Sequence, residues 1–393
     1  MQRRITPVIA GFGALLLVAA ACGPAPAAAP AGGQAAAPAG QAKPSGQSAP
    51  AATAAKPAVQ ALVDGAKSEP ALKGTWSQAS FGGSQGLQEL IAGVNKKYGT
   101  NIQAQFTPGR DMQAVVELLA QEQAAGQPAS TDVYLGNAPA MVDALRTGTL
   151  KPMDWPSLLD RSLPTDPNFD PLAPDGIALA FATTVVGIAY NTNMVRGADV
   201  PRSMEDVFKP QWKGKIASTP YAAGMREFVM PDVLGREYIF DYTRRLSQQV
   251  GGLMRCGEGD RITSGEFIML VFTCGGSDVV ELKRRGAPID HTVVQEASVL
   301  HMRYAGVPKN SAAPNSAALL IAYLHTPEGQ QILWNLDGMD LHLYPESNTK
   351  KEVDQVKAAG GKLAYNSPQW LMSSPGFTET QQELERILRE ATR

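Results

Sequence analysis

The spacing of apolar residues along this chain changes repeatedly between the periods of helices and of strands. Residues 84–97 carry Leu87, Leu90, Ile91 and Val94 at three- and four-residue intervals, which predicts a helix with one apolar face. Short apolar runs bounded by turn residues predict buried strands. We expect strands over residues 75–81, 101–106, 131–135, 185–190, 215–218, 253–256, 267–273 and 293–304, and helices over residues 84–97, 111–125, 139–147, 236–249, 278–284, 314–324, 327–334 and 378–391.

Polar and glycine residues mark several of the expected helix ends. Asp111 stands where an N-cap is expected, and Gly148 stands where a helix stops. Thr378 and Gln381 have the spacing of a capping box. Because strands and helices alternate, the pattern predicts an α/β fold with mostly parallel sheets covered by helices.

The first residues of the chain have the features of an export signal. Arg3 and Arg4 precede an apolar run over residues 5–21, which is too short to span a bilayer comfortably and has signal-peptide flanks. Small residues lead directly to Cys22, as in a bacterial lipobox; an ordinary signal peptide with a chance cysteine is the alternative. We therefore expect residues 1–21 to be a lipoprotein signal peptide, and Cys22 to carry a lipid that anchors the protein outside the cytoplasm.

Residues 22–72 are rich in Ala, Pro and Gly. Such a segment offers too little apolar surface to offset the entropy of ordering it, so we expect a disordered tether. About 320 residues follow, which is enough for two lobes with cores of their own. The formal net charge of −2 and the scattered Lys and Arg residues provide no basic surface for nucleic acid.

A family resemblance is carried by residues 185–219, which read VVGIAYNTNMVRGADVPRSMEDVFKPQWKGKIAST. The "G-x-x-YNT" strand and the "WKGKI" run resemble those of extracytoplasmic solute-binding proteins of ABC importers, in the iron(III)/oxyanion-type branch. Residues 326–330, TPEGQ, resemble the "S/T-x-E-G-Q" segment of the same family. The resemblance implies a two-lobed periplasmic-binding-protein-like fold of type 2, in which two mixed or parallel sheets with flanking helices are joined by crossing hinge strands. It implies a first lobe over residues 73–190, a second lobe over 191–301, and a return to the first lobe with the C-terminal helices over 302–393.

Three junctions of a strand, a small-residue loop and a helix are divided between these expected lobes. Helix N-termini present backbone N–H groups that bind anions, and arginine suits planar recognition of carboxylate or phosphate. We therefore expect the three loops and two arginines to surround a ligand between the lobes. The candidate ligand-binding residues are Ser80, Gly83, Ser84, Arg110, Asn137, Thr219, Tyr221, Arg226, Gly275, Gly276 and Ser277.

One of these loops also fits a catalytic motif. Residues 82–86, GGSQG, match the G-x-S-x-G turn that presents a nucleophilic serine in hydrolases. The motif follows the first predicted strand, earlier than in a hydrolase, and none of the four histidines has a distinctive partner in the sequence. A secreted serine hydrolase using Ser84 stays as an alternative, and so does a sensory or scaffolding lipoprotein with the same fold.

Cys256 and Cys274 are expected to form a disulfide, because an even pair outside the cytoplasm is usually oxidised. No Cys-x-x-Cys pair or Cys/His cluster indicates a metal site. Iron-binding relatives hold ferric ion through adjacent tyrosines in the loop after the strand at 267–273, whereas this chain has Thr-Cys-Gly-Gly there. The leading hypothesis is a monomeric, non-enzymatic receptor without cofactor or metal. It would capture a small anion or an oxygen-presenting complex and pass it to an ABC permease in the membrane.

Overall fold

The computed structural model describes residues 56–390, apart from residues 79, 110 and 375. All described residues belong to one compact unit that begins at Ala54. The predicted signal peptide, Cys22 and Arg110 lie outside the described residues. Among the helices of the described part, none is both long enough and apolar enough to cross a membrane.

The central sheet of the first lobe is built around strand β10, which has ten residues. It pairs antiparallel with β3 and β4 and parallel with β11, while β1 and β2 pair in parallel and join β3 through a bridge between Gly74 and Val133. All seven residues of β4 are buried, with Phe181 in one apolar core and Val185 in another. The strands are β1 (Leu72–Trp76), β2 (Ala104–Pro108), β3 (Tyr134–Asn137), β4 (Leu179–Val185), β10 (Ala297–Gly306) and β11 (Lys362–Asn366).

The second lobe contains a mixed five-stranded sheet in the order β7-β6-β8-β5-β9. Its side chains alternate between two cores, as a strand of period two requires: Ile216 and Val271 pack on one face, and Ala217 and Leu270 on the other. The strands are β5 (Ile188–Asn191), β6 (Ile216–Ser218), β7 (Gly252–Leu253), β8 (Met269–Val271) and β9 (Ile289–Thr292).

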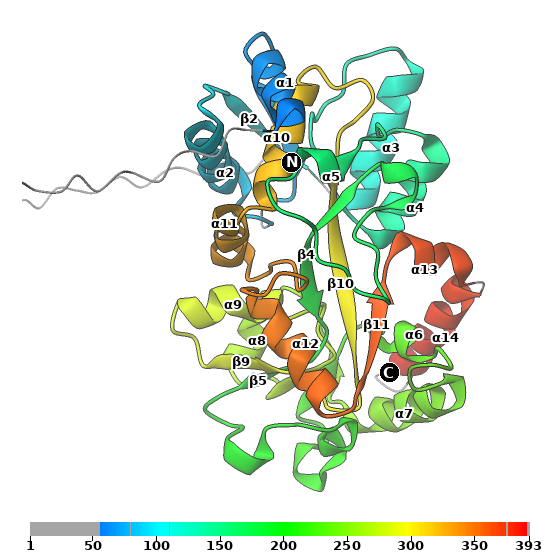
Figure 1. Cartoon of the computed structure of the whole chain (residues 1–393). Coiled ribbons are helices and arrows are strands. Elements are labelled where there is room, and N and C mark those ends of the chain that lie inside the picture. Colours follow the sequence, from blue (N-terminus) through cyan, green and yellow to red (C-terminus); the bar gives the residue numbers. More distant parts are fainter. Residues whose placement is uncertain (1–55, 79, 110, 375, 391–393) are drawn as a thin grey trace, which may run out of the picture. The chain divides into compact units, whose positions relative to one another are not determined.

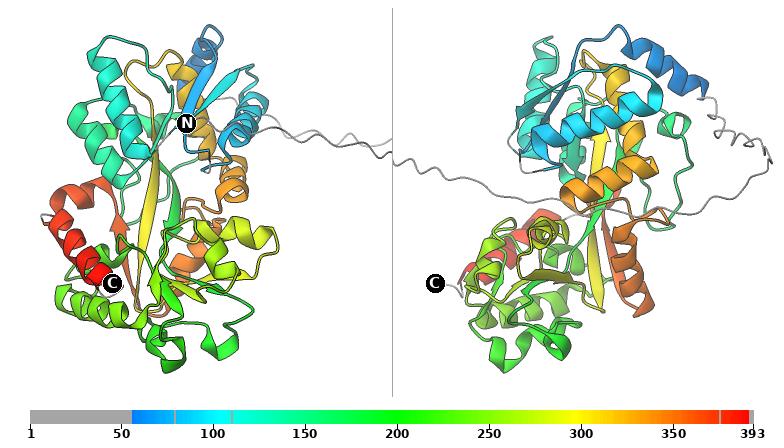
Figure 2. Two further views of the ribbon diagram at one scale, coloured as in Figure 1. Left: turned by 180° about the vertical axis from the view of Figure 1, so that it is seen from behind. Right: turned by 90° about the vertical axis from the view of Figure 1, so that its left-hand side faces the viewer.

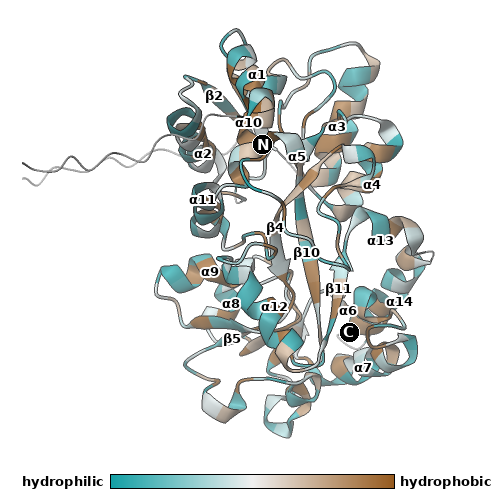
Figure 3. Cartoon of the chain, viewed as in Figure 1, coloured by the Kyte–Doolittle hydropathy of each residue, from teal (hydrophilic) through white to brown (hydrophobic). Residues whose placement is uncertain are grey.

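Helices cover both sheets, and their apolar faces turn inward. Strand β10 itself contains many hydrophobic residues, whereas α11 and α12 are mostly hydrophilic on their exposed sides (Figure 3). The helices are α1 (Pro57–Ala66), α2 (Gly83–Tyr98), α3 (Met112–Ala124), α4 (Ala138–Thr147), α5 (Trp155–Leu158), α6 (Met225–Phe228), α7 (Arg236–Gln249), α8 (Asp260–Thr263), α9 (Ser277–Arg284), α10 (Pro314–Leu324), α11 (Pro327–Asp337), α12 (Asn348–Ala358), α13 (Pro368–Ser373) and α14 (Phe377–Glu390).

Two of the three predicted helix ends are confirmed. Asp111 caps α3 by accepting a hydrogen bond from the Ala114 backbone N–H, and Gly148 ends α4 in the left-handed conformation. The predicted capping box at Thr378 is wrong, because α14 begins one residue earlier. The ring of Phe377, the first residue of α14, packs edge-on against that of Trp370, with centroids 5.0 Å apart.

Helix α1 lies inside the segment predicted to be a tether, so the tether cannot extend to residue 72. Its apolar residues Val59, Leu62 and Val63 are buried and belong to the same core as α10. Glu69, just after the helix, accepts hydrogen bonds from the backbone N–H groups of Asn315 and Ser316 at the start of α10, both at 2.8 Å. The folded body therefore begins near residue 56.

The C-terminal helix packs against the second lobe. Leu384 and Leu388 of α14 share a core with Tyr242 of α7, and the two helices lie side by side in Figures 1 and 2. Thus the chain returns to the first lobe in α10 and α11 and then crosses again before it ends.

The lobes are connected by strands that lie side by side (Figure 1). After β4 the chain continues through Val186 and Gly187 directly into β5 of the second lobe. The Val186 N–H donates to the Val299 carbonyl at 2.8 Å, and the Ser298 hydroxyl donates to the Val186 carbonyl at 2.6 Å. These bonds tie the first crossing to β10, as expected for crossing hinge strands.

Candidate functional site

Residues from both lobes surround a cavity of about 250 Å³, called here the arginine cavity. The first lobe supplies the start of α4, the second supplies the loop between β6 and α6, and the crossing strands β10 and β11 form the wall between them. The lining residues are Asn137, Ala138, Pro139, Tyr221, Ala223, Gly224, Arg226, Cys274, His301, Met302, Arg303, Asn366 and Gln381.

Arg226 reaches this cavity from α6 and is held by its neighbours. Its Nε donates to Glu227 Oε1 at 2.9 Å, one Nη donates to Gln381 Oε1, and its guanidinium lies 4.4 Å from the centre of the Phe377 ring. A guanidinium has five N–H donors, so these contacts orient Arg226 without using all of them.

Glu227 is a fully buried carboxylate behind the cavity wall. Burial by itself raises the pKa of its carboxyl group, but the adjacent Arg226 guanidinium and the His301 imidazole outweigh burial and lower the pKa to about 2. The Asn366 amide also donates to Glu227 Oε1, at 2.6 Å. Glu227 is therefore ionised at neutral pH and joins α6 to His301 in the middle of β10 and to Asn366 at the end of β11.

Arg303 and His301 project from one face of β10, two residues apart. Arg303 lies opposite Asn137 of β3, next to a register shift in the pairing of β10 with β4. His301 Nδ1 lies 3.3 Å from the Cys274 carbonyl oxygen, and His301 Nε2 lies 3.7 Å from Glu227 Oε1. Three groups that are cationic or can become so, Arg226, His301 and Arg303, thus line the cavity, while no Asp or Glu does.

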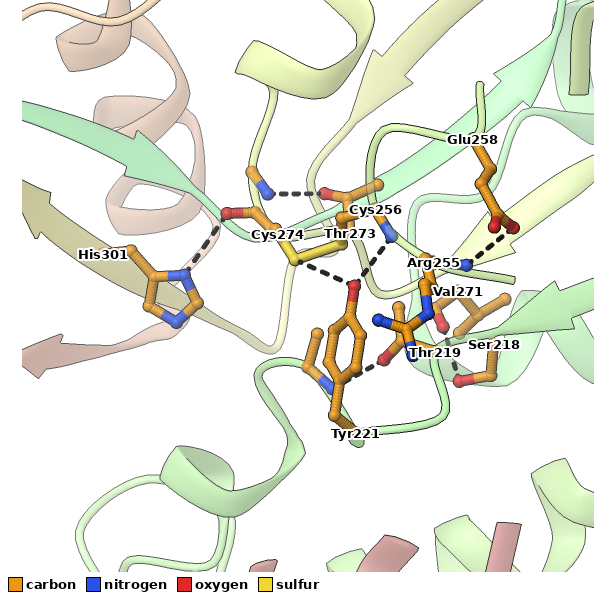
Figure 4. The surroundings of a disulfide bond; sticks show 12 residues. Ser218, Thr219, Tyr221, Arg255, Cys256, Glu258, Val271, Thr273, Cys274 and His301 are labelled. Atoms are coloured by element: carbon orange, nitrogen blue, oxygen red, sulfur yellow. Dashed lines mark hydrogen bonds between the residues drawn. A yellow bond between two sulfur atoms is a disulfide. The ribbon is translucent and has the colours of Figure 1, made fainter. Parts of the chain in front are cut away.

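The predicted disulfide between Cys256 and Cys274 is present, with the two Cα atoms 5.9 Å apart. Its cysteines follow β7 and β8, which are not direct neighbours because β6 lies between them. The Tyr221 hydroxyl accepts a hydrogen bond from the Cys256 N–H at 2.7 Å and lies 3.6 Å from Cys274 Sγ (Figure 4). Tyr221 therefore packs its phenol against the disulfide at the cavity wall.

Arg303 also borders a second cavity, of about 410 Å³. Two predicted residues, Ser80 and Ser277, line it together with Cys256, so the disulfide and Arg303 separate the two cavities. This second cavity contains carboxylates as well as cations. Its charged lining residues are Asp260, Glu281, Arg285, Arg303 and Asp337.

The glycine-rich turn before α2 has a structural explanation. Phe81, Gly82 and Gly83 all have positive φ, and a Cβ atom at Gly86 would lie only 1.8 Å from the Phe81 carbonyl oxygen. Ser84 is exposed on α2 and lines neither cavity. The motif thus arises from a tight turn and a close helix approach.

Three other predicted residues use their polar groups within the protein. The Thr219 hydroxyl accepts from the Ala223 N–H at 2.8 Å. The Gly275 N–H donates to the Thr273 hydroxyl at 3.0 Å, and the Gly276 N–H donates to the Val185 carbonyl at 3.2 Å. These polar groups are therefore engaged within the protein, and the loop after β8 is tied to the hinge.

Sequence reasoning placed Asn137, Tyr221 and Arg226 where the structure brings them together, but it missed His301, Arg303, Asn366 and Gln381. The signal for two of these was available, because His301 and Arg303 are polar positions at alternate places in an apolar strand. Asn366 and Gln381 come from elements near the C-terminus, and no local pattern indicates that they return to this cavity.

A larger cavity, of about 640 Å³, lies along β11 and α13. It is lined by residues such as Asp170, Asp232, Tyr365 and Trp370 and by none from the loops after β6 and β8. We assign the candidate site to the arginine cavity because two arginines and no carboxylate line it, whereas the second cavity contains carboxylates as well. Among the described residues, no group of three His, Cys, Asp or Glu side chains is arranged to hold a metal ion.

Comparisons with known proteins agree with this architecture. The profile of the bacterial extracellular solute-binding proteins matches residues 89–359. The Fe(3+)-binding periplasmic protein of Serratia marcescens is 31% identical over 105 residues, which span 26% of this chain and only 29% of that protein.

Solved structures with the same fold cover most of the chain. The substrate binding protein of the ABC transporter from Agrobacterium tumefaciens aligns with a TM-score of 0.62 at 17% identity, over 84% of this chain and 97% of that one. The spermidine/putrescine ABC transporter substrate-binding protein PotD from Streptococcus pneumoniae aligns with a TM-score of 0.58 at 17% identity, over 82% and 100%. At this identity the likeness establishes the two-lobed α/β fold of periplasmic binding proteins.

Proposed function

This chain belongs to the bacterial extracellular solute-binding proteins, and from that premise we propose that it captures a small anion, or a complex that presents anionic oxygens, in the arginine cavity. The family and its structural neighbours are solute-binding proteins rather than enzymes, so the hydrolase alternative based on Ser84 is set aside.

The charge of the cavity wall carries this proposal. Arg226 enters the arginine cavity from α6 of the second lobe, and Arg303 enters it from the crossing strand β10. No carboxylate lines this cavity. Guanidinium groups bind carboxylate and phosphate through paired, charge-assisted hydrogen bonds. Closure of the lobes around the solute would bring Arg226 of the second lobe toward Arg303 on the hinge, so binding energy would favour the closed state.

The iron-binding name of one relative extends to this chain only in a modified form. The loop after β8 carries no phenol, and the hydroxyl of Tyr221 already accepts a hydrogen bond from the Cys256 N–H. A bare ferric ion would find no tyrosine pair in that loop. A chelate whose outer surface consists of anionic oxygens would instead suit the arginines.

Delivery and attachment complete the proposal. The captured solute would pass to an ABC permease in the membrane, and the protein would act as a monomer held outside the cytoplasm by a lipid on Cys22. Helix α1 is packed on α10 of the first lobe, so an N-terminal tether would be attached to that lobe.

Isothermal titration calorimetry against acetate, citrate, phosphate, ethylphosphonate, spermidine and ferric citrate tests the proposal. We expect anions to bind and spermidine not to bind. Arg303→Met should weaken anion affinity about 10- to 100-fold, because a charge-assisted hydrogen bond contributes about 1.5–3 kcal/mol. Glu117→Gln, at an exposed position of α3, is the control. Preferential binding of spermidine, or unchanged affinity in Arg303→Met, would refute the proposal.

A further inference from the structure

The wall of the arginine cavity contains a buried hydrogen-bond acceptor, Asn366 Oδ1, that has no donor among the described residues. Glu227 Oε2 is also buried and unpaired, but Glu227 lies behind the wall and does not line the cavity. An unpaired buried acceptor costs about 1–3 kcal/mol, so the Asn366 oxygen at the cavity requires an explanation.

The orientation of the Asn366 amide is fixed by its neighbour. Its Nδ2 donates to the ionised Glu227 at 2.6 Å. The reverse orientation would place an amide oxygen against a carboxylate oxygen, which is repulsive. Oδ1 is therefore the end of the amide that is left without a partner, and it can only accept.

The His301 ring is oriented by the same kind of argument. Its Nδ1 lies 3.3 Å from the Cys274 carbonyl oxygen, which accepts hydrogen bonds but cannot donate them. Nδ1 must therefore carry the hydrogen. The ring's Nε2 faces Glu227 Oε1 at 3.7 Å, so both ring nitrogens lie next to acceptors of the protein and neither is offered to a solute.

The cavity thus offers cationic groups beside an acceptor: the guanidinium groups of Arg226 and Arg303, and the amide oxygen of Asn366. A plain anion would pair with the arginines and leave the Asn366 oxygen unsatisfied. We propose that the solute is an anion with a hydroxyl or ammonium donor next to its acidic group, of the α-hydroxy or α-amino acid type. This inference rests on the proposed function of anion capture in this cavity.

Matched pairs of small anions test the inference on the natural protein. Each pair differs in one donor: lactate and propionate, alanine and propionate, 1-aminoethylphosphonate and ethylphosphonate, citrate and tricarballylate. By calorimetry we expect the donor-bearing member of at least one pair to bind at least about tenfold more tightly, because a site built to hydrogen-bond a substrate group rejects the analogue that lacks it. The pairs with hydroxyl and ammonium donors also distinguish the two kinds of donor.

Glu227→Gln provides the second test, since it is isosteric and keeps an acceptor oxygen for Asn366 and Arg226. Its neutral amide can present either an oxygen or a nitrogen to Asn366, so the Asn366 oxygen is no longer held toward the cavity. The ratio of affinities within each matched pair should fall at least about fivefold, whereas Glu117→Gln should leave it unchanged. A merely structural role of Glu227 would weaken both members of a pair equally.

The two proposals can fail separately. If both members of every pair bind equally to the natural protein, and Arg303→Met weakens both, the requirement for a donor is wrong and anion capture stands. If no anion binds, both proposals are wrong. Because the first comparison uses the natural protein, the test does not depend on the folding of any variant.

Discussion

The disulfide between Cys256 and Cys274 provides a stability prediction whose size follows from the chain itself. The two cysteines are 18 residues apart in sequence. In the chain-entropy model, a crosslink across about 18 residues lowers the entropy of the unfolded chain by about 11 cal/mol/K, or about 3 kcal/mol at 25 °C. Removing the crosslink should therefore lower the free energy of unfolding by about this amount.

The assay is equilibrium unfolding in urea, followed by circular dichroism, of the oxidised protein, the reduced protein and the double variant Cys256→Ser, Cys274→Ser. The reduced protein and the variant should unfold at lower urea concentration than the oxidised protein, with a difference of about 3 kcal/mol. Reductant should not change the variant, which is the internal control. If all three unfold at the same urea concentration, the closed loop is not a constraint on the unfolded chain, and the reasoning fails.

Two further predictions concern the first lobe, one a buried histidine and the other a partly buried carboxylate. Burial lowers the pKa of His342 to about 4 from an ordinary 6.5, so the folded protein is fully stable with respect to this group above pH 6.5 and loses stability as the pH falls toward 4. Between pH 7 and pH 5, the free energy of unfolding in urea should fall by about 2 kcal/mol more in the natural protein than in His342→Gln. An equal fall in both proteins would contradict this. Glu69→Ala should lower the free energy of unfolding by about 2 kcal/mol because it uncaps α10, with Glu117→Gln as control, and a loss no larger than that of the control would show that the cap is dispensable.

The sequence predicted the elements whose signals are local. The bounds of α7 and α10, Arg236–Gln249 and Pro314–Leu324, fall where the apolar spacing and flanking residues place them. Helix α1 was missed because the segment was judged by average composition, although Val59, Leu62 and Val63 have helical spacing. A short amphipathic helix that packs on a distant partner is invisible to composition alone.

The candidate site was predicted only where a residue adjoins a recognisable loop. Arg226 follows the loop after β6, and Asn137 caps α4, so both have local signals. Gln381 and Asn366 reach the cavity because α14 crosses to the second lobe and β11 pairs with β10. Such placements depend on contacts between residues far apart in sequence, which no single window of the chain contains.

The register of strand β10 determines which of its side chains face the core and which face the arginine cavity. Leu300, Met302 and Tyr304 are buried in one core, while His301 and Arg303 point to the opposite face, at the cavity. A slip of one residue would bury the arginine and expose the apolar side chains, so packing of the core fixes the position of the charges. Because β10 is also a strand on which the hinge is built, a solute bound to Arg303 in the proposed way would act directly on the element that joins the lobes. The residues proposed to recognise the solute and those proposed to allow closure are neighbours on one strand, which would couple binding to closure without an intervening pathway.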